Sequence, residues 1–339
     1  MEIDRIHFYV VDALRTRDLL IEQIGLQALG ERVNEHTIEY LVGNDNLLFS
    51  IASPLTAASP VADYLARHPS GVKDVSFRVT DLNAIRKRIE SSRTPILATS
   101  DLAEDVEWIK IRGWGGIEHT ITQARSKSIK PAIATTDSII SIDHVVLNVP
   151  AGDLEMATVW YIHFLGFKVQ QNFNIQSKKS GLTSKALISP CGRVRFNINE
   201  PSSSNSQIQE FLDLNCGAGI QHIALQTNDI LSTVDRLGQQ ELAFLSIPQA
   251  YYTNLRNRAN SEQNLLLTND EWQQLERLQI LMDWSSATPT EILLQIFTQP
   301  IFESPTFFFE LIERRNRAQG FGQGNFQALF EAIEEYNSI

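Results

Sequence analysis

Runs of alternating apolar and polar residues predict strands along the chain, and the most apolar of these runs is TFFFELIERR at 306–315. A period of two places Phe308 and Glu310 on one face of this strand and Phe307 and Phe309 on the other. Bulky apolar residues occupy both faces, so we expect the strand to be buried on both sides. Because burying an ionised carboxylate is costly, Glu310 must be protonated, paired with a base or bound to a metal ion.

The chain contains an internal repeat, which is the most informative feature of its organisation. GVKDVSFRVTDL at 71–82 can be aligned with GIQHIALQTNDI at 219–230, with the glycine and the closing aspartate in matching places. The openings of the two halves also match, since DRIHFYV resembles SIDHVVLNV, and this alignment pairs His7 with His144. The two halves therefore read as diverged copies.

Each copy is predicted to start with a strand and an amphipathic helix, at 13–26 in the first copy and at 151–167 in the second. Several strands separated by Gly, Asn and Ser turns follow, which gives a βαβββ module. We expect an α+β fold in which paired modules form two open barrels. The polar, proline-containing segment 126–138 is the predicted linker between an N-terminal domain over 1–130 and a C-terminal domain over 139–339.

Composition and charge describe a globular protein and exclude several classes of partner. Apolar residues make up 43% and charged residues 20% of the chain. A formal charge of −11 argues against nucleic acid or an anionic membrane as partner, because both require a basic surface. Cys191 and Cys216 are too few for a disulfide framework or a cysteine-based zinc site. Neither a signal peptide nor a membrane-spanning run is visible, so we expect a cytoplasmic protein.

Two histidines in the second copy share the apolar setting of Glu310. Alternation places His144 on a strand face with Val146, and His222 on a strand face with Ile220. Two imidazoles and one carboxylate on separate strands match the arrangement that holds Fe(II) in oxygenases with open coordination positions. A histidine in an apolar strand is more often an ordinary core residue, and the three residues form no local motif, so this alternative stays open.

The first copy differs at the corresponding positions. Asp74 stands where the second copy has His222, and the position of Glu310 falls near Glu118 or His119. These residues allow a second metal site in principle. We expect instead that the first copy has lost its metal site and has a structural role.

Eight segments of the second copy carry a resemblance to a known family. They are IDHVVLNV (142–149), GLTSKAL (181–187), NEP (199–201), SQIQEFL (206–212), GAGIQHIAL (217–225), LLQIFTQP (293–300), FFELIERR (308–315) and GFGQGNFQALFEAIE (320–334). In content, order and spacing these segments resemble the 4-hydroxyphenylpyruvate dioxygenases, members of the vicinal oxygen chelate superfamily of glyoxalase, bleomycin-resistance and dioxygenase proteins. The first 135 residues resemble the family only in their general βαβββ pattern.

The resemblance implies an enzyme that holds one Fe(II) per subunit through His144, His222 and Glu310. It implies that an aryl 2-oxoacid binds the iron through its carboxylate and keto oxygens, with O2 as second substrate. The implied reaction converts 4-hydroxyphenylpyruvate to homogentisate and CO2 by oxidative decarboxylation, ring hydroxylation and side-chain migration. It would serve tyrosine catabolism or the synthesis of tocopherol-type quinones. Family habit suggests a homodimer or homotetramer.

The resemblance also implies a substrate pocket. Its polar residues, which are expected to orient the substrate ring and its hydroxyl, are Ser184, Asn199, Gln207, Gln221 and Gln295. Its walls are Phe297, Phe308, Phe321, Asn325, Phe326 and Leu329, although core packing is an equally simple role for each phenylalanine. The glycine-rich segment 320–336 is expected to form a lid helix over the pocket, with an ordinary terminal helix as the alternative.

Three positions depart from the family pattern and leave other functions open. Thr183, Asn197 and Leu147 replace the usual asparagine, proline and glycine, which alters the pocket wall. Asn197 keeps 4-hydroxymandelate synthase as a rival, whereas Phe326 favours ring hydroxylation. A non-catalytic small-molecule-binding protein of the same fold would not need all three ligands. An extradiol ring-cleaving dioxygenase shares the ligands but not the segments LLQIF and GFGQGNF.

Overall fold

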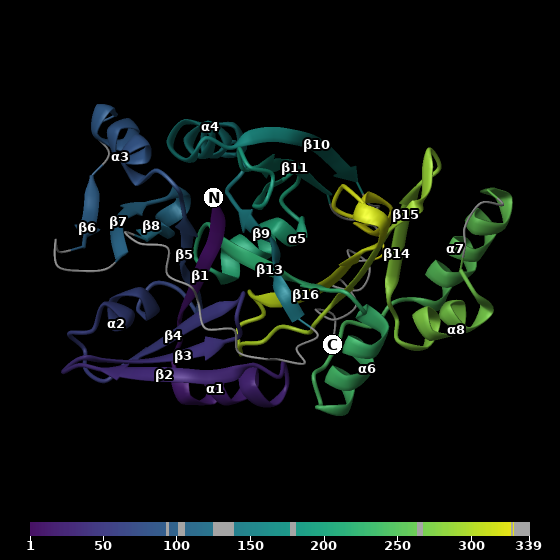
Figure 1. The fold of residues 1–339 in the computed structure, drawn as a ribbon, viewed down its shortest axis with the longest axis horizontal. Helices are drawn as coiled ribbons and strands as arrows, with labels where there is room; N and C mark the ends of the chain where they lie inside the picture. The colour runs from purple at the N-terminus through teal and green to yellow at the C-terminus, as the bar shows by residue number, and fades with distance from the viewer. Residues whose placement is uncertain are drawn as a thin grey trace.

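The computed structural model contains two mixed eight-stranded sheets, one from each half of the chain (Figure 1). The structure describes residues 1–92, 95–100, 106–124, 139–176, 181–262, 267–326 and 328. Among these residues no helix is both long and apolar enough to cross a membrane. The predicted linker at 126–138 lies outside the described residues, and the division into two domains stays a prediction.

The first sheet comes from the N-terminal half, on the left of Figure 1. Its strands are β1 (Glu2–Tyr9), β2 (Gln27–Val33), β3 (Thr37–Gly43), β4 (Leu48–Pro54), β5 (Gly71–Arg78), β6 (Ile96–Thr99), β7 (Val106–Arg112) and β8 (Glu118–Ala124). Its helices are α1 (Ala13–Glu22), α2 (Pro60–Leu65), α3 (Leu82–Ser91) and the short 3-10 helix η1 (Trp114–Gly116). The strand order is β2-β3-β4-β1-β5-β8-β7-β6.

The second sheet repeats this order as β10-β11-β12-β9-β13-β16-β15-β14. Its strands are β9 (Ile139–Asn148), β10 (Lys168–Gln176), β11 (Gly181–Ile188), β12 (Arg195–Pro201), β13 (Gly219–Thr227), β14 (Leu281–Ser285), β15 (Thr288–Phe297) and β16 (Phe308–Arg314). Its helices are α4 (Leu154–Leu165), α5 (Gln207–Leu214), α6 (Ile230–Gln239), α7 (Gln249–Glu262) and α8 (Asn269–Arg277), with 3-10 helices η2 (Arg315–Arg317) and η3 (Gln323–Asn325). Helices α7 and α8 have no counterpart in the described part of the first half.

Each sheet is a pair of four-stranded modules joined at its centre. The central strands β1 and β5 are antiparallel, while β1 pairs in parallel with β4 and β5 in parallel with β8. In the second sheet β9, β13, β12 and β16 are paired in the same way. Every module has a strand, a helix and three further strands in this order, and the last module also contains α7 and α8. The predicted α+β fold of paired βαβββ modules is therefore confirmed.

One hydrophobic core extends across both halves. Phe8 of β1 packs against Phe307 with ring centroids 5.2 Å apart, and Phe49 of β4 lies 5.8 Å from Phe309 of β16. Glu310, which follows Phe309 in sequence, faces away from this core into the second sheet's own pocket. The predicted two-sided burial of this strand is confirmed, since only Arg314 at its end is partly exposed.

A buried hydrogen bond also joins the two halves. His119 on β8 is fully buried, and its Nδ1 lies 2.9 Å from the backbone oxygen of Val75. Nδ1 therefore carries the proton, so Nε2 accepts from the Tyr161 hydroxyl of α4 at 3.0 Å. Burial lowers the pKa of His119, which keeps the ring neutral in this arrangement.

Replacing Tyr161 by phenylalanine leaves the buried Nε2 of His119 without a partner. We expect Tyr161→Phe to lower the free energy of unfolding by about 1–3 kcal/mol. Urea unfolding followed by circular dichroism measures the change. Tyr40→Phe is the matched control, because the Tyr40 side chain is also buried and its hydroxyl has no hydrogen bond within the described residues. Equal stability of the two variants would show that the His119 contact contributes nothing.

Candidate metal centre

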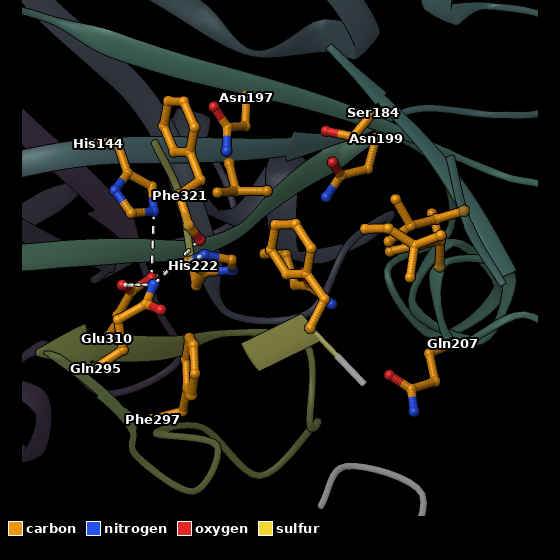
Figure 2. Close-up of a pocket in the computed structure, with 16 residues that line it drawn as sticks. His144, Ser184, Asn197, Asn199, Gln207, His222, Gln295, Phe297, Glu310 and Phe321 are labelled. Carbon is orange, nitrogen blue, oxygen red and sulfur yellow. Dashed lines mark hydrogen bonds and ion pairs between the residues drawn. The ribbon is translucent and has the colours of Figure 1, made fainter. Parts of the chain in front are cut away.

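Three buried side chains on three adjacent strands form a candidate metal site. His144 lies on β9, His222 on β13 and Glu310 on β16, and their ligand atoms all lie within 4.8 Å of one another. His144 and Glu310 are both in register with Ala224, whose side chain is a single methyl group between them. Figure 2 shows the three side chains converging at one end of a pocket. This donor set fits a divalent metal ion that keeps coordination positions open.

Two β-bulges, one next to each histidine, shape the site. On β13 the register shifts at Gln221, so both Gln221 and His222 line the pocket while Ile220 joins the hydrophobic core. The prediction that Ile220 shares a face with His222 is therefore wrong, because an extra residue breaks the alternation. On β9 the register shifts at Asp143, which reaches the ring of His144.

Asp143 fixes the orientation and tautomer of His144. Its Oδ1 lies 2.9 Å from Nδ1 of His144, which leaves Nε2 facing Glu310, 3.2 Å from Oε2. Arg314 holds Asp143 through two hydrogen bonds of 2.7 Å, and Arg195 lies 3.5 Å away. Burial alone raises the pKa of Asp143, but the hydrogen bonds from Arg314 and His144 outweigh it and keep the pKa far below its usual range.

The site holds a proton when no metal is bound. Burial raises the pKa of Glu310, but His144 and His222 outweigh it and bring the pKa to about 2. Burial lowers the pKa of His144, but Glu310 and Asp143 outweigh it and raise the pKa to about 9. The pKa of His222 stays low, because burial exceeds the effect of Glu310, 3.5 Å away. At neutral pH an imidazolium at His144 therefore neutralises Glu310.

A chain of hydrogen bonds orients the carboxylate of Glu310. Gln295 on β15 donates from Nε2 to Glu310 Oε1 at 2.8 Å, and its Oε1 accepts from Asn325 Nδ2 at 2.8 Å. Asn325 in turn accepts from the Tyr251 hydroxyl of α7 at 2.7 Å. Gly322 packs so closely that a Cβ there would lie 1.7 Å from Gln295 Oε1. Helix α7, which has no counterpart in the described part of the first half, and the segment around Gly322 thus hold the anionic ligand Glu310 in place.

A pocket opens beside the three ligands. It is enclosed mainly by β9, β11, β12, β13, β15, β16 and the start of α5. Its lining consists of His144, Val146, Ile175, Leu182, Ser184, Asn197, Asn199, Gln207, Ile208, Gln221, His222, Gln295, Phe297, Glu310, Phe321 and Phe326. In Figure 2 the metal ligands lie at one end, and Ser184, Asn199 and Gln207 lie toward the other.

Most of the residues named from the sequence meet in this cavity. The predicted pocket residues that line it are Ser184, Asn199, Gln207, Gln221, Gln295, Phe297, Phe321 and Phe326. Phe308 and Asn325 stand behind the lining: Phe308 stacks on the ring of His222 at 4.9 Å, and Asn325 holds Gln295. Leu329 and most of the predicted lid lie outside the described residues.

The sequence reasoning missed four apolar residues of the wall. Val146 and Leu182 lie two positions from His144 and Ser184, so strand alternation carried a signal for both. Ile208 follows Gln207 at the start of α5, and Ile175 is on β10, where no local pattern singled it out.

Strand register corrects the predicted equivalence of His7 and His144. The repeat places Ser76 opposite Ala224, and Ser76 pairs with Arg5 as Ala224 pairs with His144. Arg5 therefore occupies the position of His144. His7 pairs with Asp74 as Val146 pairs with His222, so His7 stands at the position of Val146.

The counterpart of Glu310 is also corrected. Asp74 lies opposite His222 as predicted, and it pairs with Glu118 as His222 pairs with Phe308. Two residues further on, Thr120 stands opposite Glu310, so neither Glu118 nor His119 is the equivalent residue. Among the described residues, the three ligand positions of the first sheet contain arginine, aspartate and threonine. That set lacks imidazole, so it does not repeat the metal site.

Metal binding should release the proton held at His144. We expect the affinity for Co(II), an oxygen-stable probe, to rise up to about tenfold per unit between about pH 6 and 8 and to level off near pH 9. Glu310 and His222 add little to this dependence, because the pKa of each is already low. Calorimetry in two buffers of different ionisation enthalpy measures the proton release. A pH-independent affinity would contradict the assignment.

A substitution at Gly322 should disturb the metal ligand Glu310 indirectly, through Gln295. Gly322 has φ +73°, and a methyl group there collides with Gln295. We expect Gly322→Ala to weaken Co(II) binding about 10–100-fold, because Glu310 loses its orienting partner. Gly152→Ala is the control, since Gly152 also has a positive φ, of +89°, but no atom of the described residues lies within 4 Å of the added carbon. Equal metal affinity in both variants would show that Gly322 does not contribute to metal binding.

Comparisons with known proteins agree with this architecture. Residues 141–268 match the model of the Glyoxalase/Bleomycin resistance protein/Dioxygenase superfamily. An uncharacterized protein of Synechocystis sp. is 38% identical, covering 98% of this chain and 97% of its own. A 4-hydroxyphenylpyruvate dioxygenase of Yarrowia lipolytica is 31% identical over 98% of this chain and 91% of its own.

A solved structure shows the same fold over the whole chain. It is a triple mutant of 4-hydroxymandelate synthase from Streptomyces coelicolor, 25% identical, with a TM-score of 0.87 over 99% of this chain and 98% of its own. The two paired-module sheets are consistent with this likeness. The chain belongs to the 4-hydroxyphenylpyruvate dioxygenase-like family of the Glyoxalase/Bleomycin resistance protein/Dioxygenase superfamily.

Proposed function

We propose that the protein is a 4-hydroxyphenylpyruvate dioxygenase that uses one Fe(II) per subunit to convert 4-hydroxyphenylpyruvate and O2 to homogentisate and CO2. The observation that carries this proposal is the His-His-Glu group at the end of a buried, largely apolar pocket. Relatives with this printed activity, such as the Yarrowia lipolytica enzyme, support it. His144, His222 and Glu310 would hold the iron, which supplies a Lewis acid and a redox centre when bound.

The charge of the pocket supports a substrate that chelates the metal. None of the described lining residues is lysine or arginine, so neither type of side chain is there to pair with a substrate carboxylate. The negative charge of a 2-oxoacid must then be balanced by the metal ion itself. An apolar wall formed by Val146, Phe297 and Phe321 keeps water from this end of the pocket.

The far end of the pocket suits a phenol. Ser184, Asn199 and Gln207 lie on the side away from the metal ligands, where they can exchange hydrogen bonds with a ring hydroxyl (Figure 2). Phe321 and Phe326 provide aromatic faces for the ring between the two ends. Phe173 packs against both at 6.2 and 5.7 Å and fixes their positions.

A second candidate is 4-hydroxymandelate synthase, for which one residue provides a specific reason. Asn197 lines the pocket, and its buried Oδ1 has no hydrogen-bond partner in the described part of the chain. An unpaired acceptor costs free energy in the apo protein, so it is available to a polar group of the substrate. Asn197 pairs with Val146, two residues from His144, and lies on the His144 side of the pocket in Figure 2, so this contact can influence which carbon is attacked. The likeness to a 4-hydroxymandelate synthase structure points the same way.

Oxygen consumption and product analysis test the proposal. With Fe(II) and 4-hydroxyphenylpyruvate, we expect stoichiometric O2 uptake and homogentisate as the aromatic product. Glu310→Gln keeps the side-chain size but removes the anionic ligand, so turnover should fall by about a hundredfold or more. Glu303→Gln, at a side chain that is 93% exposed, is the matched control and should keep full activity.

Each alternative has its own outcome in this assay. 4-Hydroxymandelate as product would replace the first proposal by the second. Metal-independent binding of the oxoacid without O2 uptake would indicate a non-catalytic binding protein. Turnover of catechols would indicate ring cleavage. The homodimeric or homotetrameric state, the cytoplasmic location and the role in tyrosine catabolism or quinone synthesis stay predictions.

A further inference from the structure

The first sheet contains a second cavity. It corresponds to the metal pocket of the second sheet, because Arg5, Asp74 and Thr120 line it from the three ligand positions. The remaining lining residues are Asp4, His7, Arg32, Glu39, Leu48, Ser76, Arg78, Val106, Trp108, Lys110 and Thr122. The cavity has therefore kept its place in the fold while its chemistry changed.

Asp74 is fully engaged and does not offer its oxygens to a metal ion. Oδ1 accepts from the Ser76 hydroxyl at 2.9 Å and the Thr120 backbone N–H at 3.1 Å, and Oδ2 accepts from the Thr120 hydroxyl at 2.6 Å. Lys110 lies 3.6 Å away and neutralises the charge. Burial raises the pKa of Asp74, but Lys110 and Thr120 outweigh it and keep the group ionised.

The other carboxylates of the cavity are also occupied. Asp4 accepts hydrogen bonds from Arg78 and from the Thr122 hydroxyl. Glu39 accepts one from Ser50. The lining contains four cations and three carboxylates, and two further carboxylates just outside it, Glu118 and Glu2, pair with Lys110 and Arg78.

Arg5 is a cation of this cavity that has no carboxylate partner among the described residues. No described residue forms a hydrogen bond or ion pair with its guanidinium, and its Nε is buried without a partner. Arg32 also lacks a described partner, but it lies on exposed β2 at the rim, where water solvates it. A half-buried guanidinium without a partner is costly, which indicates that its partner is a ligand.

His7 adds a neutral hydrogen-bonding group beside Arg5. Its Nε2 is buried without a hydrogen bond to any residue that the structure describes, and it lies 3.7 Å from Glu39 Oε1. Burial lowers the pKa of His7 to about 4 despite the opposing effects of Glu39 and Asp74, so the ring is neutral near pH 7. It therefore does not neutralise Glu39, and it can serve a ligand as donor or acceptor.

The cavity also has an apolar side. Trp108 occupies the position that Gln295 has in the metal pocket, since both pair with residues at matching positions of β8 and β16. Leu48 and Val106 extend this surface. Such a wall suits the carbon skeleton of an organic acid better than inorganic phosphate, which has none.

We propose that the first half of the chain is a metal-free binding site for a small organic acid, whose carboxylate pairs with Arg5 and whose carbon skeleton packs on Trp108. A guanidinium and a carboxylate form paired hydrogen bonds, which explains an arginine at the position of a metal ligand. The site departs from the purely structural role expected of this half.

Calorimetry on the full-length, Fe(II)-loaded protein under anaerobic conditions tests the site, with phenylacetate as the probe. We expect Arg5→Met to remove one phenylacetate site or to weaken it at least tenfold. Arg15→Met is the control, because Arg15 on α1 is 78% exposed, and it should bind as the wild type does. Neutral 2-phenylethanol should not bind at this site, and inorganic phosphate should bind more weakly than phenylacetate. Phosphate binding equal to that of phenylacetate would overturn the organic-acid assignment.

Binding in the metal pocket is distinguished by the Glu310→Gln variant, which keeps Arg5. The proposal is overturned if Arg5→Met binds phenylacetate unchanged, or if Glu310→Gln abolishes all binding. Thermal unfolding without ligand provides a second readout, because removing an unpartnered guanidinium should leave the midpoint equal or higher. A midpoint lower than that of Arg15→Met would show that Arg5 has a structural partner, which also overturns the proposal.

Discussion

The burial of one carboxylate determines how the metal centre in the second half of the molecule is built. Glu310 is 1% exposed in a strand of phenylalanines, and its charge survives there only because cationic or metal partners meet it. Two imidazoles from neighbouring strands provide this environment, and the amide of Gln295 fixes the second oxygen. The strand order β9-β13-β16 is what brings the three ligands together.

One residue, Arg314, supports both the metal site and the segment 318–321 at the pocket wall. Arg314 donates hydrogen bonds to Asp143, which in turn orients His144. The Nη1 atom of the same guanidinium donates to the backbone oxygens of Ala318 and Gly320. Phe321, next in the chain, lies 5.4 Å from the ring of His144. One buried cation therefore couples the orientation of a metal ligand to the position of the pocket wall.

The two halves show how one backbone supports different chemistry. The bulge at Asp143 has its counterpart at Asp4, and each of these aspartates is held by an arginine. The residue after each bulge points into a cavity, but it is His144 in one half and Arg5 in the other. With imidazole the position serves a metal ion, whereas a guanidinium, which stays protonated, cannot ligate a metal and instead attracts an anion.

The sequence by itself determined the paired βαβββ modules and the candidate ligands, because strand alternation, the repeat and the isolated carboxylate of Glu310 are local signals. It could not determine the equivalence of Arg5 with His144, or the joint exposure of Gln221 and His222 to the pocket. Those depend on β-bulges, which change the register by one residue and leave no reliable mark in the sequence. The hydrogen-bond chain from Tyr251 to Glu310 was equally hidden, since it joins an inserted helix to distant strands only after the chain has folded.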